Sequence, residues 1–265
     1  MRPLSEQTVL ITGATDGLGR ALALDLAGRG MTVLAHGRDE DRLQALLAEL
    51  GPAARSYRAD LSSLAEVRVM AETVEADVDR LDVLVSNAGI GREVPGGPGR
   101  QESADGLELR FAVNYLAGYL LTRELLPLLR AAGEARIVNV SSAAQMPIDF
   151  DDVQLTKDYG GTRAYSQSKL AQILSTVDLA EELQGTGVTV NALHPATFMP
   201  TKIVANPTST IEEGVEATAR LVVDPGLAGV TGRYFDGLRE TRAHEQAYDP
   251  EARRRLRQLS DELVG

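Results

Sequence analysis

Short runs of apolar and β-branched residues alternate along this chain with longer stretches in which apolar positions recur every three or four residues. The short runs are typical of buried strands, and the longer stretches are typical of amphipathic helices. About seven strands are predicted, at Thr8–Thr12, Thr32–His36, Arg55–Ala59, Leu81–Ser86, Arg136–Ser141, Thr189–Leu193 and Gly232–Phe235. Helices are predicted at about 17–29, 39–50, 62–76, 105–131, 163–184, 210–223 and 249–263.

Regular alternation of strands and helices predicts an α/β fold, in which a parallel sheet carries helices on both faces. We expect one Rossmann-like, doubly wound domain over residues 1–265, because neither a repeat nor a linker divides the chain. Loops near 91–102, 143–162 and 197–210 interrupt the alternation. Ligands of such sheets bind beyond the carboxyl ends of the strands, so these loops are expected to form the substrate pocket.

Composition narrows the function classes. Hydrophobic residues make up 43% of the chain and charged residues 25%, which is typical of a globular protein. A net charge of −11 disfavours nucleic-acid binding, which needs clustered Lys and Arg. The chain has no cysteine, so thiol chemistry and thiolate metal sites are excluded, and no metal is expected.

The sequence also gives an expectation for where in the cell the protein is found. The segment before the first apolar run, Met1–Gln7, is short and polar and resembles neither a signal peptide nor a transit peptide. No apolar run approaches the roughly 20 residues that a membrane helix requires. We therefore expect no membrane span and a cytoplasmic protein.

A glycine-rich turn follows the first predicted strand. Its sequence, Thr12-Gly13-Ala14-Thr15-Asp16-Gly17-Leu18-Gly19, leads into a helical pattern. Glycines at such a turn let the backbone approach a pyrophosphate closely, and the amides at the helix start face the anion. The spacing differs from the common G-x-G-x-x-G, but the position directly after the first strand favours dinucleotide binding over a purely structural turn.

The end of the second strand bears on the choice between NADP and NAD. An acidic residue there usually binds the ribose hydroxyls of NAD, whereas this strand ends in His36-Gly37-Arg38. Arg38 can pair with a 2′-phosphate, which favours NADP, although Asp39 and Asp16 weakly favour NAD and Arg38 can instead be a solvated residue in the first turn of the next helix. After the third strand, Asp60 and Leu61 are expected beside the adenine, with Asp60 or Ser62 as a helix cap.

Tyr165 and Lys169 lie four residues apart in a helical pattern, so their side chains share one face. A cation near a phenol lowers the pKa of the phenol toward working pH, as carbonyl–alcohol interconversion needs. The spacing alone is also common in surface pairs. A catalytic pair is favoured by the nearby strand that ends in Ser141-Ser142. Ser142 can donate a hydrogen bond to a carbonyl oxygen, or it can merely cap a turn. Asn114 can hold a water that leads to Lys169, or satisfy its own helix.

Together these motifs resemble the short-chain dehydrogenase/reductase family. The resemblance rests on the glycine-rich turn, Asn87-Ala88-Gly89, Asn114, Ser142, Tyr165 and Lys169, in the family's order from residue 8 to about 201. It implies a tetrad in which Tyr165 is the general acid/base, Lys169 lowers its pKa and binds the nicotinamide ribose, Ser142 orients the carbonyl and Asn114 positions a water. Residues 164–171 and Leu193-His194-Pro195 resemble the retinol dehydrogenase-like branch.

Two positions depart from the family pattern. Ser86 precedes Asn87 where the family has a second Asn, and Pro195 is followed by Ala196 rather than Gly. The resemblance also implies a threonine that contacts the cofactor after this proline, and Thr197 and Thr201 are both candidates. The predicted cofactor-binding residues are Gly13, Thr15, Asp16, Gly17, Leu18, Gly19, Arg38, Asp60, Leu61, Asn87, Ala88, Gly89, Tyr165, Lys169, Pro195 and Thr197.

The expected activity is carbonyl–alcohol interconversion by hydride transfer with NADP, or with NAD. Two alternatives are a lyase or epimerase that keeps its cofactor bound, and a nucleotide-sensing protein without catalysis. Apolar residues of the three loops indicate a partly apolar substrate, unless they only pack the loops; they are Met146, Pro147, Ile148, Phe150, Tyr159, Phe198 and Met199. Apolar residues in excess within 107–129 and 170–183 indicate a homodimer or homotetramer, or a thick core.

Overall fold

A computed structural model describes residues 2–93, 97, 99–197, 199–200 and 207–265. The described chain contains one eight-stranded sheet in the order β3-β2-β1-β4-β5-β6-β7-β8. Its strands are β1 (Thr8–Ile11), β2 (Thr32–Gly37), β3 (Arg55–Arg58), β4 (Val83–Ser86), β5 (Ala135–Val140), β6 (Val188–His194), β7 (Tyr234–Asp236) and β8 (Arg239–Thr241). The predicted α/β doubly wound fold is confirmed.

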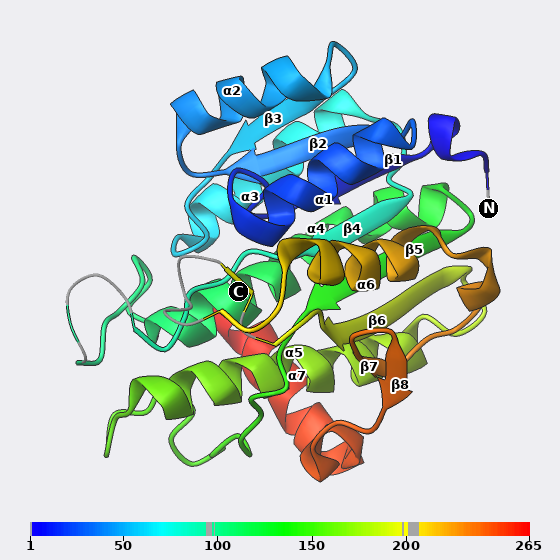
Figure 1. The fold of residues 1–265 in the computed structure, drawn as a ribbon. Helices are drawn as coiled ribbons and strands as arrows, with labels where there is room; N and C mark the ends of the chain where they lie inside the picture. The colour runs from blue at the N-terminus through cyan, green and yellow to red at the C-terminus, as the bar shows by residue number, and fades with distance from the viewer. Residues whose placement is uncertain (1, 94–96, 98, 198, 201–206) are drawn as a thin grey trace.

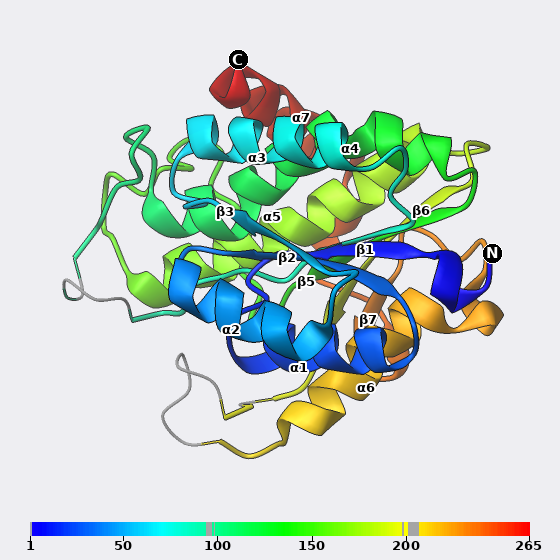
Figure 2. The ribbon, with the colours of Figure 1, turned by 90° about the horizontal axis from the view of Figure 1, so that it is seen from above.

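Helices cover the two faces of the sheet (Figures 1 and 2). The α-helices are α1 (Gly17–Gly28), α2 (Glu40–Leu50), α3 (Leu64–Asp77), α4 (Ala117–Ala131), α5 (Gly161–Glu182), α6 (Ile211–Val223) and α7 (Pro250–Val264). Figure 2 shows α1, α2 and α6 on one face and α3, α4 and α5 on the other, with α7 outside the second layer. Each face has its own buried apolar cluster.

The chain reverses its direction of strand addition between β1 and β4, which are hydrogen-bonded neighbours in the sheet. A crevice for ligands forms at such a switch point, beyond the carboxyl ends of the strands. Described parts of the three long loops lie at this edge, on the left in Figure 1. The fold thus brings the turn after β1 and the segment after β4 together.

The structure extends one sequence prediction about the elements and corrects another. About seven parallel strands were expected, and β1–β7 pair in parallel, while an eighth strand, β8, pairs antiparallel with β7. The helix expected from residue 105 begins only at residue 109. Gly106 has a φ of +75°, and a bridge between Glu102 and Glu108 precedes the helix. A π-helical turn, η2 (Phe111–Leu116), then leads into α4.

The surplus apolar residues of α4 and α5 are covered within the same chain. Helix α7 packs against α5, and the hydroxyl groups of Tyr115 and Tyr119 hydrogen-bond to Ser260 at 2.7 Å and Asp261 at 2.6 Å. This arrangement supports the thick-core explanation of that surplus.

Candidate active site

The glycine-rich turn is tied to the end of β4 by Thr12. Its hydroxyl oxygen accepts hydrogen bonds from the amides of Asn87 and Ala88, each at 3.0 Å. The Asn87 side chain donates to the Thr12 carbonyl at 2.9 Å. The turn after β1 and the segment 87–89, both predicted to contact the cofactor, therefore form one unit.

His36, which the sequence analysis did not select, supports the same turn from β2. The Gly13 amide donates to its Nδ1 at 3.1 Å, and its Nε2 lies 3.1 Å from the Ala59 carbonyl oxygen. These partners place the proton on Nε2. Burial lowers the pKa of His36 to about 4, so the ring stays a neutral acceptor at neutral pH. A histidine within a buried strand was the only sequence signal for this role.

The glycines leave no room for side chains, which fits the close approach of a pyrophosphate. A Cβ at Gly19 would lie 2.2 Å from the Gly13 carbonyl oxygen and 2.5 Å from Asn87 Nδ2. A Cβ at Gly37 would lie 2.5 Å from the methyl group of Thr15. Asp16 caps α1 through the Gly17 amide, so the bare turn ends at a helix N-terminus, where anions bind.

The remaining predicted residues of this region lie around the ends of β2 and β3. Arg38 is exposed and lies 3.8 Å from the Asp60 carboxylate, and Arg42, which sequence reasoning missed, pairs with Asp16 at 3.2 Å. Burial raises the pKa of Asp60, but hydrogen bonds from Ser62 and the Arg38 charge outweigh it and lower the pKa. Leu61 is buried.

The cap of α3 is Ser63, whose hydroxyl accepts from the Glu66 amide at 3.3 Å, so the expected caps Asp60 and Ser62 were wrong. Asp60 instead accepts from the Ser62 amide at 2.9 Å. Leu18 is buried in the apolar cluster below α1, so only its backbone faces the turn.

Tyr165 and Ser142 meet at the carboxyl edge of the sheet. The Ser142 hydroxyl lies close enough to the Tyr165 phenol to lower the pKa of the phenol, and it accepts from the Ala144 amide at 3.1 Å. Ser141 is used otherwise, because its hydroxyl donates to the Lys169 carbonyl at 2.7 Å. The structure therefore brings Ser142, and not Ser141, to the phenol.

Lys169 is buried one turn further along α5. Its Nζ lies 5.9 Å from the centre of the Tyr165 ring and donates to the Val140 carbonyl at 2.9 Å and to Gln172 Oε1 at 3.0 Å. Burial lowers the pKa of Lys169 to about 7. Gln172 was not selected from the sequence.

The Tyr165 pKa differs from the sequence expectation. Burial raises the pKa of Tyr165, and the Ser142 hydroxyl and the nearby Arg92 charge only partly offset it. Lys169 is not among the groups that shift the pKa of Tyr165 in this structure, so the predicted lowering by the lysine stays a prediction. Tyr165 is thus a protonated phenol at neutral pH.

Asn114 lies on η2 and faces the same region. Its Oδ1 accepts from the Ile90 amide at 2.7 Å, and its Nδ2 donates to the Ile90 carbonyl at 3.1 Å and to Ser168 Oγ at 3.0 Å. A Cβ built on Gly89 would lie 3.2 Å from Asn114 Oδ1 and 3.4 Å from Lys169 Nζ. The two polar groups therefore border the same small space beside Gly89.

The loop after β6 holds the last predicted contacts. Pro195 is buried, and Thr197 Oγ1 lies 3.0 Å from His194 Nε2. Thr201 and Phe198 lie outside the described residues. Of the other loop residues expected to face a substrate, Ile148 is buried and Met199 packs against Gly214 of α6, whereas Met146 is exposed. Loop packing thus explains part of that apolar set.

The buried lysine gives a testable pH dependence. Lys169 has a folded pKa near 7 against an ordinary 10.5, so between these values the unfolded chain binds more protons. The free energy of unfolding of the cofactor-free protein should therefore rise with pH in this window, by at most about 1.4 kcal/mol per unit. Urea unfolding at pH 7 and pH 9 measures it.

Lys169→Met should remove that pH dependence, and the exposed Lys157, changed to Met, should keep it. His36 titrates below the window, and the buried tyrosines titrate above it, since burial raises the pKa values of Tyr57, Tyr115 and Tyr234. A slope that persists in Lys169→Met would contradict this origin.

Comparison with known proteins agrees with the geometry. A family model described as short chain dehydrogenase matches residues 7–212. The chain is 38% identical to "Retinol dehydrogenase 13" of Mus musculus, over 98% of this chain and 84% of that protein. The protein belongs to the short-chain dehydrogenase/reductase family, whose members are oxidoreductases that use NAD or NADP.

Solved structures of similar proteins have the same fold as this chain. An uncharacterized protein from Mycobacterium paratuberculosis superposes with a TM-score of 0.80 at 28% identity, covering 98% of this chain and 93% of that one. The 3-ketoacyl-(acyl-carrier-protein) reductase from Brucella melitensis, complexed with NADH, has a TM-score of 0.71 at 27% identity, covering 88% and 97%. Within the described residues, no helix is long and apolar enough to cross a membrane, and no cluster of His, Asp and Glu could hold a metal ion.

Proposed function

We propose that this protein reduces a ketone or aldehyde to an alcohol with NADPH, and catalyses the reverse reaction when the alcohol is abundant. The observation that carries the proposal is the convergence of Asn114, Ser142, Tyr165 and Lys169 beside a glycine-rich turn that fits a dinucleotide. When bound, the nicotinamide supplies the hydride. Every other step falls to side chains of this chain.

In this mechanism Tyr165 donates its proton to the carbonyl oxygen. The raised pKa of Tyr165 supports this direction, because the phenol is protonated at neutral pH. Ser142, whose hydroxyl lies near the phenol, donates to the same oxygen as negative charge develops on it. Asn114 Oδ1 and Lys169 Nζ border one space beside Gly89, where a water that contacts both can return a proton toward Tyr165.

The test is a panel of retinoid, steroid and aromatic carbonyl compounds assayed with NADPH and with NADH. Retinoids are included because the similar curated proteins are named retinol dehydrogenases. Net oxidation of the reduced cofactor with one carbonyl class supports the proposal. Conversion of a substrate without net oxidation indicates a lyase or epimerase, and cofactor binding without any conversion indicates a sensor.

NADP preference is the finer part of the proposal, and Arg38 is its basis. Its exposed guanidinium follows β2, with the Arg42 side chain on the next helix. Arg38→Gln should raise the KM for NADPH by about 10- to 100-fold, as the loss of a charge-assisted hydrogen bond does, and leave the KM for NADH nearly unchanged. Arg29→Gln, a control at the C-terminal cap of α1 whose partner is Asp25, should change neither. Equal changes for both cofactors would contradict the assignment.

Three coarser features accompany this function as proposals. The described residues form one eight-stranded sheet, which supports a single domain over 1–265. The covering of α4 and α5 by α7 supports a monomer over the dimer or tetramer expected above, and size-exclusion chromatography with light scattering tests it. The cytoplasmic location stays a prediction, which cell fractionation tests.

A further inference from the structure

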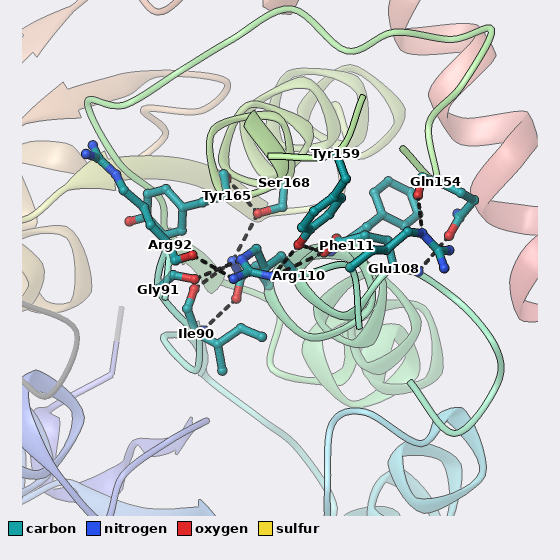
Figure 3. A network of polar contacts seen from close by, with 12 residues as sticks. Ile90, Gly91, Arg92, Glu108, Arg110, Phe111, Gln154, Tyr159, Tyr165 and Ser168 are labelled. Carbon is teal, nitrogen blue, oxygen red and sulfur yellow. Dashed lines mark hydrogen bonds and ion pairs between the residues drawn. The ribbon is translucent and has the colours of Figure 1, made fainter. Parts of the chain in front are cut away.

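A buried ion pair that the mechanism does not use belongs to a polar network that joins the loop after Gly89 to the helix that precedes α4 (Figure 3). The side chains of Arg110 and Glu108 are 0% and 1% exposed, and Arg110 Nη1 lies 3.5 Å from Glu108 Oε1. The Tyr159 hydroxyl bridges them, accepting from Arg110 at 2.5 Å and donating to Glu108 at 3.0 Å. Removing charges from water is costly, so such a pair persists only where its other groups are also satisfied.

The other donors of Arg110 hold the backbone of the loop that follows Gly89. Arg110 Nε donates to the Gly91 carbonyl at 2.9 Å, and Nη2 donates to the Arg92 carbonyl at 2.7 Å. Asn114, one helical turn further on, holds the amide and the carbonyl of Ile90. Two side chains of one helix thus fix three successive loop residues.

The same loop contacts the first residue of the helix that carries Tyr165. A Cβ at Gly161 would lie 2.3 Å from the Arg92 carbonyl oxygen and 3.3 Å from Arg110 Nη2. Figure 3 shows the Arg92 side chain beside Tyr165, and its charge lowers the pKa of the phenol. A shift of this loop therefore changes both the packing of α5 and the charge near Tyr165.

We propose that Arg110 is a positioning residue for Tyr165: it clamps the loop 90–92 against the start of α5 and so fixes Arg92 beside the phenol. The proposal rests on the proposed function of Tyr165. Neither Arg110 nor Glu108 touches the reacting atoms, so both act through the loop.

The test compares two buried arginines that each hold two carbonyl groups. Arg110→Lys keeps the charge beside Glu108 but loses the planar fork that reaches both carbonyls. Its matched control is Arg136→Lys, since Arg136 is 5% exposed and donates to the Leu221 and Asp224 carbonyls, at the opposite end of β5 from Ser142. We expect Arg110→Lys to lower kcat on the order of tenfold or more and to leave the KM for NADPH little changed, whereas Arg136→Lys keeps kcat.

A second readout needs no substrate. The phenolate absorbance of Tyr165, taken as the difference between each protein and its Tyr165→Phe counterpart, should titrate at higher pH in Arg110→Lys. Arg92→Gln should shift it in the same direction without loss of thermal stability, because Arg92 is exposed. The other groups that face the phenol are unchanged in these variants; they are Ser142, Lys169 and Tyr234.

A fall in kcat that Arg136→Lys matches, or a Tyr165 titration that does not move in Arg110→Lys, would overturn the proposal. If Arg110→Lys does not fold, Tyr159→Phe replaces it, because it removes only the bridging hydroxyl, and it should show smaller changes in the same directions. Absence of turnover in the parent protein refutes the proposed function instead, and the titration still decides the role of Arg110.

Discussion

Tyr165→Phe should lower kcat by about 10²- to 10⁴-fold, the usual contribution of a positioned general acid, with little change in NADPH affinity. The variant removes the one proton that the mechanism delivers to the carbonyl oxygen but keeps the aromatic ring near Lys169. The groups around the glycine-rich turn, which the cofactor pyrophosphate would contact, are unaffected, because Thr12, Asn87 and His36 hold the turn independently of Tyr165. Steady-state kinetics and a fluorescence titration with NADPH measure the two quantities.

Tyr57→Phe is the matched control for that substitution. Tyr57 lies on β3 at the edge of the sheet, and its hydroxyl donates to Asp77 at 2.9 Å. Its loss should reduce the free energy of unfolding by about 1 kcal/mol and leave kcat unchanged. Turnover retained in Tyr165→Phe, or lost equally in Tyr57→Phe, would remove Tyr165 from the centre of the mechanism.

The sequence was most informative where local pattern and buried position coincide. Strands such as β1, with Val9, Leu10 and Ile11 fully buried, are continuous apolar runs, and their alternation with helices was enough to predict the fold. Strand β8 escaped prediction because Arg239, Glu240 and Thr241 are polar and it exists only through pairing with β7. No local pattern reports that kind of partner.

For the candidate site, too, local pattern was predicted correctly and contacts between distant segments were not. The helical spacing of Tyr165 and Lys169 correctly put both residues on α5 near each other. The spacing could not show that Lys169 donates to Val140 and Gln172, or that burial raises the Tyr165 pKa, because both depend on segments distant in the sequence. Sequence reasoning missed Arg110 for the same reason, since a single arginine in a helical pattern is normally a solvated residue.

Gly19→Ala should disable the cofactor site more completely than any single charge change. The added Cβ would lie 2.2 Å from the Gly13 carbonyl oxygen and 2.5 Å from Asn87 Nδ2, and the first of these is backbone that cannot rotate away. Helix α1 must then move off the turn, which costs about 1–3 kcal/mol of stability and takes the helix N-terminus away from the pyrophosphate. We expect NADPH binding to be lost even where the protein remains folded.

Gly28→Ala, in the same helix, separates this effect from a general effect of alanine. A Cβ at Gly28 would meet no atom within 4 Å, so this variant should be more stable by about 0.4–1 kcal/mol and should bind NADPH normally. Urea unfolding and NADPH titration of both variants give the comparison. If Gly19→Ala bound NADPH as tightly as Gly28→Ala, the close packing of Gly19 against Gly13 and Asn87 would not be what shapes the dinucleotide site, and the turn would have to be regarded as structural.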